Sequence, residues 1–556
     1  RDVAPSRGLG DVYKRQGAHK ADSGYTFRVY APRAVRVTLI GEFNGWLEYD
    51  LIRPKNSNFF EGTFADVKPN MMYKYRVYST PDEFVEHSDP YGFGMELRPG
   101  SASIIRELDE FKFTDDEWMA KRDVGYNNPV NIYELHLASW RQKEDGSWYT
   151  YTETGEMLVP YLKENGYTHV ELMPITEHPA DESWGYQATG FFSPTSRYGT
   201  VDQLKYFVDC CHQNGIGVIM DWVPGGFCAD SHGLATFNGH MLFEHEIHPN
   251  WGTHKFDFAR GEVRSFLVSN VLYWLENFHV DGIRMDGVSS MLYLNFGIDD
   301  PGQKKFNKYG TEEDLDASAF IRQVNCAVEA HFPDVMMMAE ESTAWPLVTY
   351  PPQDGGLGFH YKWDMGWMND TLDYFKKTSD ERRENLGKLT FSMMYAWNEH
   401  YILPFSHDEN VHGKATIVQK MYGEYEGKFP QARALYLYMA IHPGKMLDFM
   451  GNEFAQLREF DESREQDWMV LKYPNHDDFH RYRRALNEAY LANEAFWSRE
   501  YDPEAFRWLD CAHPELDACA IWRDGHDGAV LAAFNFGDTE PVSYTHLRAH
   551  ETELHL

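Results

Sequence analysis

Residues 263–278 read VRSFLVSNVLYWLENF, and they lie between two short apolar runs, GVIMDW (217–222) and GIRMD (282–286). Apolar side chains recur through the long stretch at the spacing of an amphipathic helix. The flanking runs have the length and bounds of buried strands. A helix that joins two strands in this way is the unit of a parallel β/α fold.

The same alternation continues on both sides of this unit. A second helical pattern, VDQLKYFVDCCHQNG (201–215), precedes the first run. Eight apolar runs occur in all: NIYELHL (131–137), HVELMP (169–174), GVIMDW (217–222), GIRMD (282–286), VMMMAE (335–340), FHYKW (359–363), ILPFSHD (402–408) and KMLDFMG (445–451). Eight β/α units predict a closed (β/α)8 TIM barrel. An open doubly wound sheet is the alternative, and neither a GxGxxG motif nor a P-loop supports it.

Shorter strands are expected outside the barrel. YTFRVYAP (25–32) and YKYRVYS (73–79) alternate apolar and polar residues, which predicts an N-terminal β-sandwich. ACAIWR (518–523) and AVLAAFNF (529–536) predict strands of a truncated C-terminal β-domain. The expected boundaries are 17–115 for the sandwich, 116–495 for the catalytic barrel and 496–540 for the partial C-terminal β-domain. Residues 1–16 and 541–556 resemble translated sequencing adapters, so we treat both as non-native tails.

Composition limits the partners. The 556 residues carry a net charge of −34, which disfavours nucleic acid and anionic membranes but not a neutral polymer. Aromatic residues make up 15%, as large cores or as platforms for sugar rings. No apolar run has the length of a transmembrane helix. The six cysteines show no metal-binding spacing, which favours reduced thiols in the cytoplasm: Cys210, Cys211, Cys228, Cys326, Cys511 and Cys519.

Four of the runs carry an acid at or directly before their last residue: Asp221, Asp286, Glu340 and Asp408. The carboxyl ends of barrel strands meet at one mouth, where such enzymes carry their chemistry. Cleavage of a glycosidic bond uses one carboxylate at the anomeric carbon and a second, protonated, to release the leaving oxygen. Arg284 lies on the strand face of Asp286 and should keep it ionised. A strand-end acid can also simply cap a helix, and the case therefore depends on the set.

These motifs together resemble the branching-enzyme version of the α-amylase superfamily. Four segments match the four sequence regions of that superfamily: DWVPGGF (221–227), DGIRMDGVSSMLY (281–293), MAEEST (338–343) and LPFSHDENVHGK (403–414). GEFNGW (41–46) resembles the starch-binding-like sandwich that precedes the barrel in branching enzymes and isoamylases. The resemblance extends over residues 25–535.

The resemblance implies an enzyme that cuts α-1,4-glucan and rejoins it through α-1,6 bonds, in glycogen biosynthesis. Asp286 would be the nucleophile, Glu340 the general acid and base, with Glu341 its exposed or structural neighbour, and Asp408 the stabiliser of the transition state. The substrate-binding residues would be Tyr186, Asp221, Arg284 and His407. Tyr186 would stack beneath the sugar, or else pack in the barrel. The substrate would be glycogen, amylose or starch, and no cofactor or metal is implied.

One residue departs from the family pattern. The first region normally reads DWVP-x-HF, and here Gly226 stands at the position of the expected sugar-binding histidine. Loss of that imidazole would cost about 1–3 kcal/mol at the reacting sugar. Two alternatives therefore stay open: a hydrolase of the same superfamily (a debranching enzyme or a trehalohydrolase), and a weakened glucan-binding relative.

For several further aromatic residues and histidines the sequence allows both a structural and a functional role. His136 reads more readily as a packed histidine than as an acid or ligand. His240, His245, His248 and His254 have no standard metal spacing, so a substrate-facing loop is the better interpretation. Trp46 fits a glucan platform and a core position equally well.

Overall fold

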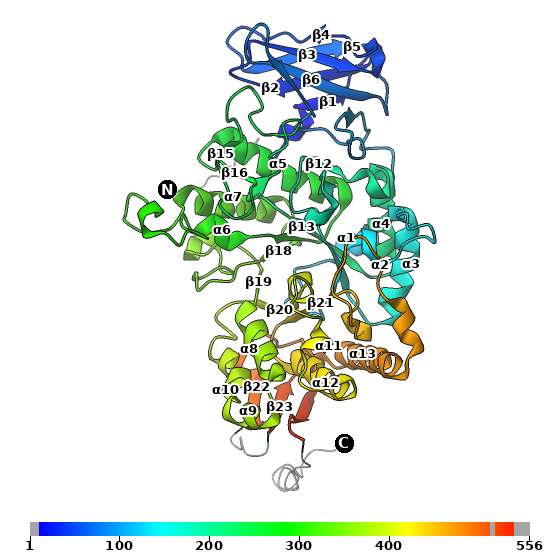
Figure 1. Cartoon of the computed structure of the whole chain (residues 1–556), viewed down its shortest axis with the longest axis vertical. Coiled ribbons are helices and arrows are strands. Elements are labelled where there is room, and N and C mark those ends of the chain that lie inside the picture. Colours follow the sequence, from blue (N-terminus) through cyan, green and yellow to red (C-terminus); the bar gives the residue numbers. More distant parts are fainter. Residues whose placement is uncertain (1–9, 512–516, 539–556) are drawn as a thin grey trace.

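The computed structural model describes residues 10–511 and 517–538. Strands of the N-terminal part lie at one end of the molecule, the barrel lies in the middle, and the last strands lie at the other end (Figure 1). Among the described helices, none has the length and apolar character that crossing a bilayer requires.

The N-terminal part is a sandwich of two sheets. The first has the order β1-β2-β5, and the second has the order β4-β3-β6-β7 with β8 paired to β6. The strands are β1 (Gly17–Lys20), β2 (Tyr25–Tyr30), β3 (Arg36–Gly41), β4 (Tyr49–Asp50), β5 (Phe59–Phe64), β6 (Met72–Tyr78), β7 (Phe84–His87) and β8 (Ser103–Ile104). Alternate residues of β2 are buried, because one face covers the core, so the expected sandwich is confirmed.

Eight parallel strands close into the barrel, in the order β10-β13-β17-β18-β19-β20-β21-β9. They are β9 (Asn131–Leu135), β10 (His169–Leu172), β13 (Gly217–Trp222), β17 (Gly282–Met285), β18 (Met336–Ala339), β19 (Tyr361–Trp363), β20 (Tyr401–Phe405) and β21 (Lys445–Phe449). Each of the eight apolar runs supplies one of these strands. The prediction of a closed barrel is therefore confirmed, and the open sheet is excluded.

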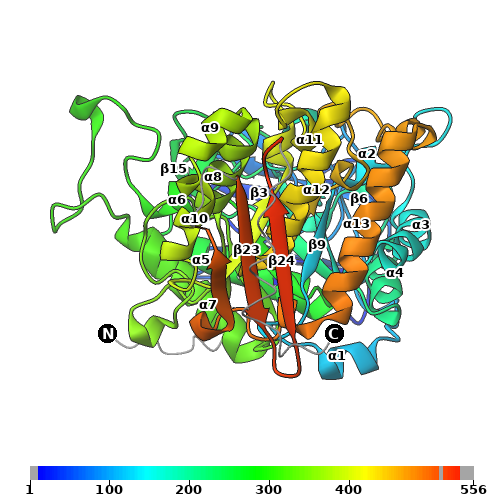
Figure 2. The ribbon, with the colours of Figure 1, turned by 90° about the horizontal axis from the view of Figure 1, so that it is seen from below.

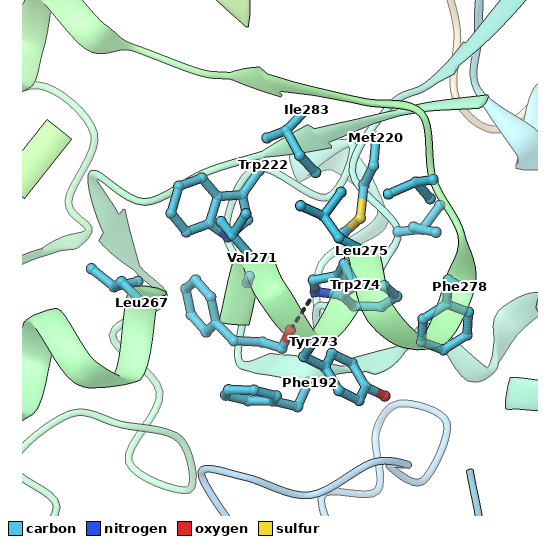
Figure 3. Packing of buried hydrophobic residues seen from close by; sticks show 14 of the residues in the cluster. Phe192, Met220, Trp222, Leu267, Val271, Tyr273, Trp274, Leu275, Phe278 and Ile283 are labelled. Atoms are coloured by element: carbon cyan, nitrogen blue, oxygen red, sulfur yellow. Dashed lines mark hydrogen bonds between the residues drawn. The ribbon is translucent and has the colours of Figure 1, made fainter. Parts of the chain in front are cut away.

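Helices surround the barrel because each presents an apolar stripe to the strands. The main ones are α3 (Tyr151–Glu164), α4 (Val201–Gln213), α5 (Gly261–Phe278), α7 (Leu315–His331), α8 (Met365–Lys376), α12 (Tyr425–Ile441) and α13 (Pro474–Ala492), and the shorter ones are α1 (Asp116–Lys121), α2 (Leu137–Trp140), α6 (Val288–Leu292), α9 (Ser379–Glu384), α10 (Gly387–Thr390) and α11 (Ile417–Lys420). Figure 3 shows Trp274 of α5 packed in the core near Met220 of β13, with its indole N–H donating to the carbonyl of Phe191 at 3.1 Å.

Two small sheets extend from the barrel mouth. The hairpin of β11 (Thr176–Glu177) and β12 (Gly190–Pro194) follows β10. A three-stranded sheet of order β14-β16-β15 follows β13, formed by β14 (Gly226–Phe227), β15 (Glu244–Ile247) and β16 (His254–Phe256). Both insertions lie between a barrel strand and the next helix, and they therefore shape the mouth.

An antiparallel sheet of β22 (Phe506–Asp510), β23 (Ala518–Asp524) and β24 (Ala529–Asn535) ends the described chain. β24 contacts α12, and Figure 2 shows β23 and β24 side by side at this end of the molecule. Residues 10–16, which we set apart from the fold, pack against α5: the Tyr13 N–H donates to Ser269 Oγ at 3.0 Å. Residues 1–9 and the 541–556 tail lie outside the described residues, and the domain boundaries stay predictions.

Candidate active site

The four acids expected at strand ends lie at the same mouth of the barrel. Asp221 is the penultimate residue of β13, Asp286 and Glu340 directly follow β17 and β18, and Asp408 follows β20. The first three strands are neighbours: the Asp286 N–H donates to the Trp222 carbonyl at 2.9 Å, and the Glu340 N–H donates to the Met285 carbonyl at 3.0 Å. The parallel register therefore aligns three acids side by side.

Arg284 joins two of these acids. Its Nη1 lies 2.9 Å from both carboxylate oxygens of Asp221 and 2.7 Å from Asp286 Oδ1. Arg284 and Asp221 are buried, and the guanidinium lies over the ring of Trp363. Burial raises the pKa of Asp221 to about 7, although the arginine opposes this shift. A buried arginine that bridges two carboxylates fixes the position of both.

The Asp286 carboxyl differs in one respect from the expectation. Burial raises its pKa above the ordinary value, and the opposing effect of Arg284 is smaller. Asp408 also raises this pKa, because like charges gather at the mouth. The ion pair exists as expected, but it does not by itself set the direction of the shift.

Glu340 lies directly beside the segment that carries Asp286. Its Oε2 accepts a hydrogen bond from the Gly287 N–H at 2.8 Å. Burial raises the pKa of Glu340 to about 8, the Arg284 charge lowers it, and the Asp286 charge raises it further. A carboxyl group with such a pKa is largely protonated at neutral pH, as a proton donor must be. Glu341, which follows it, is buried and pairs with Lys362 at 2.9 Å, so it is structural.

His407 is held by a carboxylate that the sequence reasoning missed. The Glu134 Oε1 of β9 lies 2.6 Å from His407 Nδ1, and its Oε2 accepts from the His407 N–H at 2.8 Å. Burial lowers the pKa of His407, but Asp408 and Glu134 outweigh it and raise the value to about 9. His407 in turn lowers the pKa of Asp408, whose side chain is exposed to the cleft. An acid within the otherwise apolar run NIYELHL was the available signal.

Tyr186 completes this group from the loop between β11 and β12. Its hydroxyl donates to Asp221 Oδ2 at 2.6 Å, and its ring stacks on His407 with the centroids 5.4 Å apart. The side chain lines the cleft and also packs against the hydrophobic core, so its role beneath a sugar stays a prediction.

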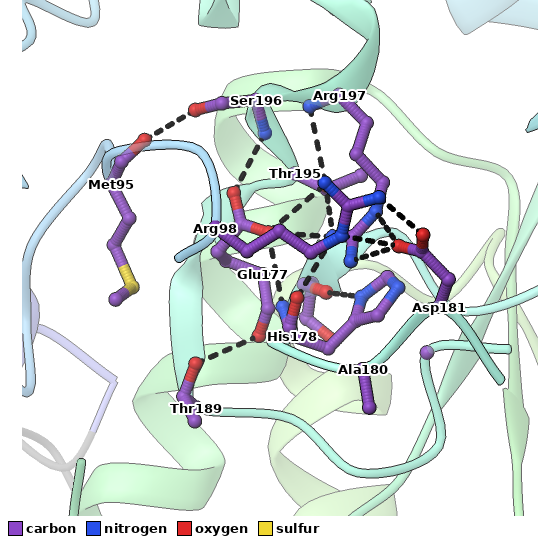
Figure 4. Close-up of polar contacts among 12 residues, drawn as sticks. Met95, Arg98, Glu177, His178, Ala180, Asp181, Thr189, Thr195, Ser196 and Arg197 are labelled. Atoms are coloured by element: carbon purple, nitrogen blue, oxygen red, sulfur yellow. Dashed lines mark hydrogen bonds and ion pairs between the residues drawn. The ribbon is translucent and has the colours of Figure 1, made fainter. Parts of the chain in front are cut away.

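The loop that carries Tyr186 is fixed by a buried ion pair. Arg197 lies 3.0 Å from Glu177 and 2.6 Å from Asp181 (Figure 4). Arg98 of the N-terminal part also donates to Asp181, at 2.8 Å. The network ties the sandwich to the mouth and thereby restrains the loop.

Asp286, His407 and Asp408 of the mouth line one large cleft, with a cavity volume of about 800 Å³. Residues from several insertions line it together with the site: Trp184, Tyr186, Gly226, Trp251, Asp286, His407 and Asp408. A cleft of this size holds several sugar rings of a chain rather than one small molecule.

Gly226 lies in the wall of this cleft, in β14. A Cβ atom at this position would be 2.4 Å from the backbone carbonyl oxygen of His254. No side chain fits there without a shift of the backbone, so the imidazole expected from the family pattern is replaced by a close approach of two strands.

The remaining candidates lie as follows. His136 is buried, with Nδ1 2.8 Å from Ser139 Oγ, which fits the packed reading. Trp46 is 37% exposed and therefore is not a core residue. Over residues 10–511 and 517–538, the group with metal-ligand geometry is the acidic triplet Glu107, Asp109 and Glu110, which contains none of the four histidines.

Comparisons with known proteins identify two domains of the chain and its fold. The family model described as carbohydrate-binding module 48 (isoamylase N-terminal domain) matches residues 15–92, and the α-amylase catalytic domain matches residues 154–241. A putative α-amylase from Salmonella typhimurium superposes with a TM-score of 0.74 at 18% identity, over 94% of this chain and 93% of that chain. A pullulanase complexed with maltotetraose, from Anoxybacillus, superposes with a TM-score of 0.73 at 18% identity, over 96% of this chain and 84% of that chain. These structures share the fold.

Curated relatives are much more similar. The 1,4-alpha-glucan branching enzyme GlgB of Desulfitobacterium hafniense is 44% identical over 96% of this chain and 86% of its own length. The protein of the same name from Oceanobacillus iheyensis is 46% identical over 88% of this chain and 78% of its own length. The chain therefore belongs to the GlgB family of 1,4-α-glucan branching enzymes, within the α-amylase superfamily.

Proposed function

We propose that the chain cleaves α-1,4 bonds of a glucan and transfers the released segment to a 6-hydroxyl group, in a retaining double displacement through a glycosyl-Asp286 intermediate. The substrate would be glycogen, amylose or starch, and the branches would serve glycogen synthesis. The observation that carries this proposal is the pair of Asp286 and Glu340 on adjacent strand ends, one bonded to Arg284 and the other with a pKa of about 8.

In the first step Glu340 donates its proton to the glycosidic oxygen while Asp286 attacks the anomeric carbon. Arg284 holds Asp286 Oδ1 at 2.7 Å, so we assign the attack to Oδ2. The C–O bond to the leaving chain breaks, that chain departs with the proton, and a covalent ester forms on Asp286.

In the second step a 6-hydroxyl group attacks the same carbon from the opposite side. The Glu340 carboxylate takes the hydroxyl proton, and the bond to Asp286 breaks. Two inversions restore the α configuration. The enzyme returns to its starting protonation state, so protons and electrons balance over the cycle.

Asp408 and His407 would stabilise the charge that develops on the sugar ring. Asp408 is a carboxylate with a lowered pKa that faces the cleft, as an acid that binds hydroxyl groups and a cationic ring requires. His407 stays protonated up to a pH of about 9 and donates from Nε2. Asp221 and Arg284 would hold the other groups of the site in position, and the ring of Tyr186 would stack against the sugar.

The proposal is tested with amylose as the sole substrate. We expect the iodine absorbance to fall while the number of reducing ends stays constant, because each cleavage is followed by transfer. Reducing ends that rise in step with the loss of iodine colour would show hydrolysis instead. Asp286→Asn is expected to leave the iodine absorbance and the number of reducing ends unchanged.

A further inference from the structure

One wall of the cleft is built from two paired strands. β14 and β16 run antiparallel, with Gly226 opposite Lys255. Both residues line the same cleft as Asp286. Because the carbonyl of His254 occupies the place of a Cβ at Gly226, any polar side chain at this part of the wall must come from a neighbouring strand. Lys255 is the residue directly across the pair.

Lys255 is held in place by an acid of the next strand. Its Nζ lies 2.9 Å from Glu246 Oε1 in β15, and Glu246 Oε2 lies 2.7 Å from Lys305 Nζ. The Lys255 side chain is only 18% exposed, so the ammonium is mostly withdrawn from bulk water. Removing a cation from water is unfavourable unless an anion lies beside it, and Glu246 is that anion. An ammonium has three N–H donors, which leaves donors for a ligand after one is given to Glu246.

Trp251 provides an apolar face in the same cleft. Its ring stacks on His248 with centroids 3.8 Å apart and planes 6° apart, which fixes its orientation. The side chain is nevertheless 49% exposed. The far edge of the ring lies 3.8 Å from the position of a Cβ on Gly287, the residue after Asp286. A rigid, half-exposed indole beside a reacting centre has the form of a sugar platform, since the flat face of a glucose ring is apolar.

We propose that Lys255 is a substrate-binding residue whose ammonium, held by Glu246, donates to the hydroxyl groups of a glucosyl unit stacked on Trp251 beside Asp286. The inference rests on the proposed function and deepens it, because it assigns the wall at Gly226 to a specific subsite for a neutral α-glucan chain. A methyl-terminated side chain of similar length would keep the packing of Lys255 and remove its donors.

The first experiment measures transfer on amylose for Lys255→Met, with Lys304→Met as the matched control. Lys304 lies in the same loop as Lys305, is exposed and pairs with Glu312 at 3.3 Å, away from the cleft lining. We expect Lys255→Met to raise KM roughly 10- to 100-fold, the range of hydrogen bonds to a charged group, with kcat within about twofold. Lys304→Met should leave both unchanged, and Lys255→Arg should retain most of the affinity.

A binding measurement separates this inference from the proposed function. In the Asp286→Asn background, calorimetry with maltoheptaose reports affinity without turnover. A loss of affinity on adding Lys255→Met, absent with Lys304→Met, supports the subsite. Equal affinities of the two double variants for maltoheptaose, with unaltered thermal unfolding, would overturn the subsite. The iodine assay of the parent chain would still decide the transfer reaction. A parent chain that binds maltoheptaose through Lys255 but only hydrolyses amylose would overturn the proposed function alone.

Discussion

Glu134 Oε1 lies 2.6 Å from His407 Nδ1, and both side chains are buried. The acid is on β9 and the histidine follows β20, so the barrel closure through β21 brings them together. The contact fixes which nitrogen of His407 faces the substrate and keeps the ring protonated.

Glu134→Gln should weaken the reaction through His407. Asp408 and Glu134 together raise the pKa of His407 to about 9, and the amide removes one of these two negative partners, so the protonated ring is lost at a lower pH. We expect kcat to fall roughly 10- to 100-fold, as for a carboxylate that orients a histidine. The alkaline limb of the pH–rate profile should move below pH 8, the value that Glu340 sets in the parent chain, once the pKa of His407 falls below that of Glu340. A profile that keeps its alkaline limb, with only KM changed, would contradict the positioning role.

The pH dependence of the parent chain follows from the two central carboxyls. Burial raises the pKa of Glu340 to about 8, so the proton donor is lost above that pH and activity should decline there. Protonation of Asp286, whose pKa is also raised, should limit activity on the acid side. A bell-shaped profile of kcat is expected. Glu340→Gln cannot donate the proton and should lower kcat by roughly 100- to 10,000-fold. The control is a substrate with a fluoride leaving group, for which the first step should be retained.

Gly226→Ala should destabilise the fold, whereas Gly225→Ala should not. The new Cβ at Gly226 would lie 2.4 Å from the His254 carbonyl, while that at Gly225 would make an ordinary contact of 3.7 Å with Met291. We expect the free energy of unfolding to fall by about 1–3 kcal/mol for Gly226→Ala. Chemical denaturation of both variants measures it. Gly226→His should likewise fail to raise activity; equal stabilities of the two alanine variants would contradict the close approach.

A buried cluster at the opposite end of the barrel should make stability depend on pH. His212 Nδ1 lies 2.7 Å from Asp115 and its Nε2 lies 2.6 Å from Asp281, with all three side chains nearly inaccessible. Burial lowers the pKa of His212, but the two acids outweigh it and raise the pKa above 6.5. The stabilisation is therefore complete below pH 6.5 and is lost as pH rises through the raised value.

The acids of this cluster give stability the opposite dependence on pH. His212 and His279 lower the pKa of Asp115 despite its burial, so its contribution is present above pH 3.8 and is lost as pH falls toward the lowered value. His212→Asn should cost about 3 kcal/mol, because it removes the cation that two buried acids share and leaves only His279 beside Asp115 and Arg122 beside Asp281. It should also flatten the decline of stability above pH 6.5. Denaturation at pH 6 and pH 9 tests both, and the same slope in variant and parent would contradict the assignment.

Much of the fold was predictable because period and length are local properties of the chain. GVIMDW and GIRMD are short apolar runs around a long helical pattern, and they became β13 and β17. The end of each run also marked Asp221 and Asp286, since every parallel strand of a barrel points its carboxyl end at the same mouth.

Contacts between distant segments were not predictable from such local patterns. In the sequence, Glu134 is one polar residue in a predicted strand, and its contact with His407 follows only from the positions of β9 and β20 in the barrel. The strand pair of Gly226 and Lys255 depends on how the insertion after β13 folds back on itself. The net direction of the Asp286 pKa depends on burial, which a spacing of two residues from Arg284 does not reveal.

The central claim is that Asp286 attacks the sugar while Glu340 handles the proton. Glu340→Gln treated with α-maltotriosyl fluoride tests it most directly, because fluoride leaves without acid help while the second step lacks its base. Mass spectrometry of the digested protein should locate a maltotriosyl ester on the peptide that contains Asp286. An ester on another carboxylate would contradict the account. So would turnover of the fluoride, without any adduct, by the double variant Asp286→Asn with Glu340→Gln.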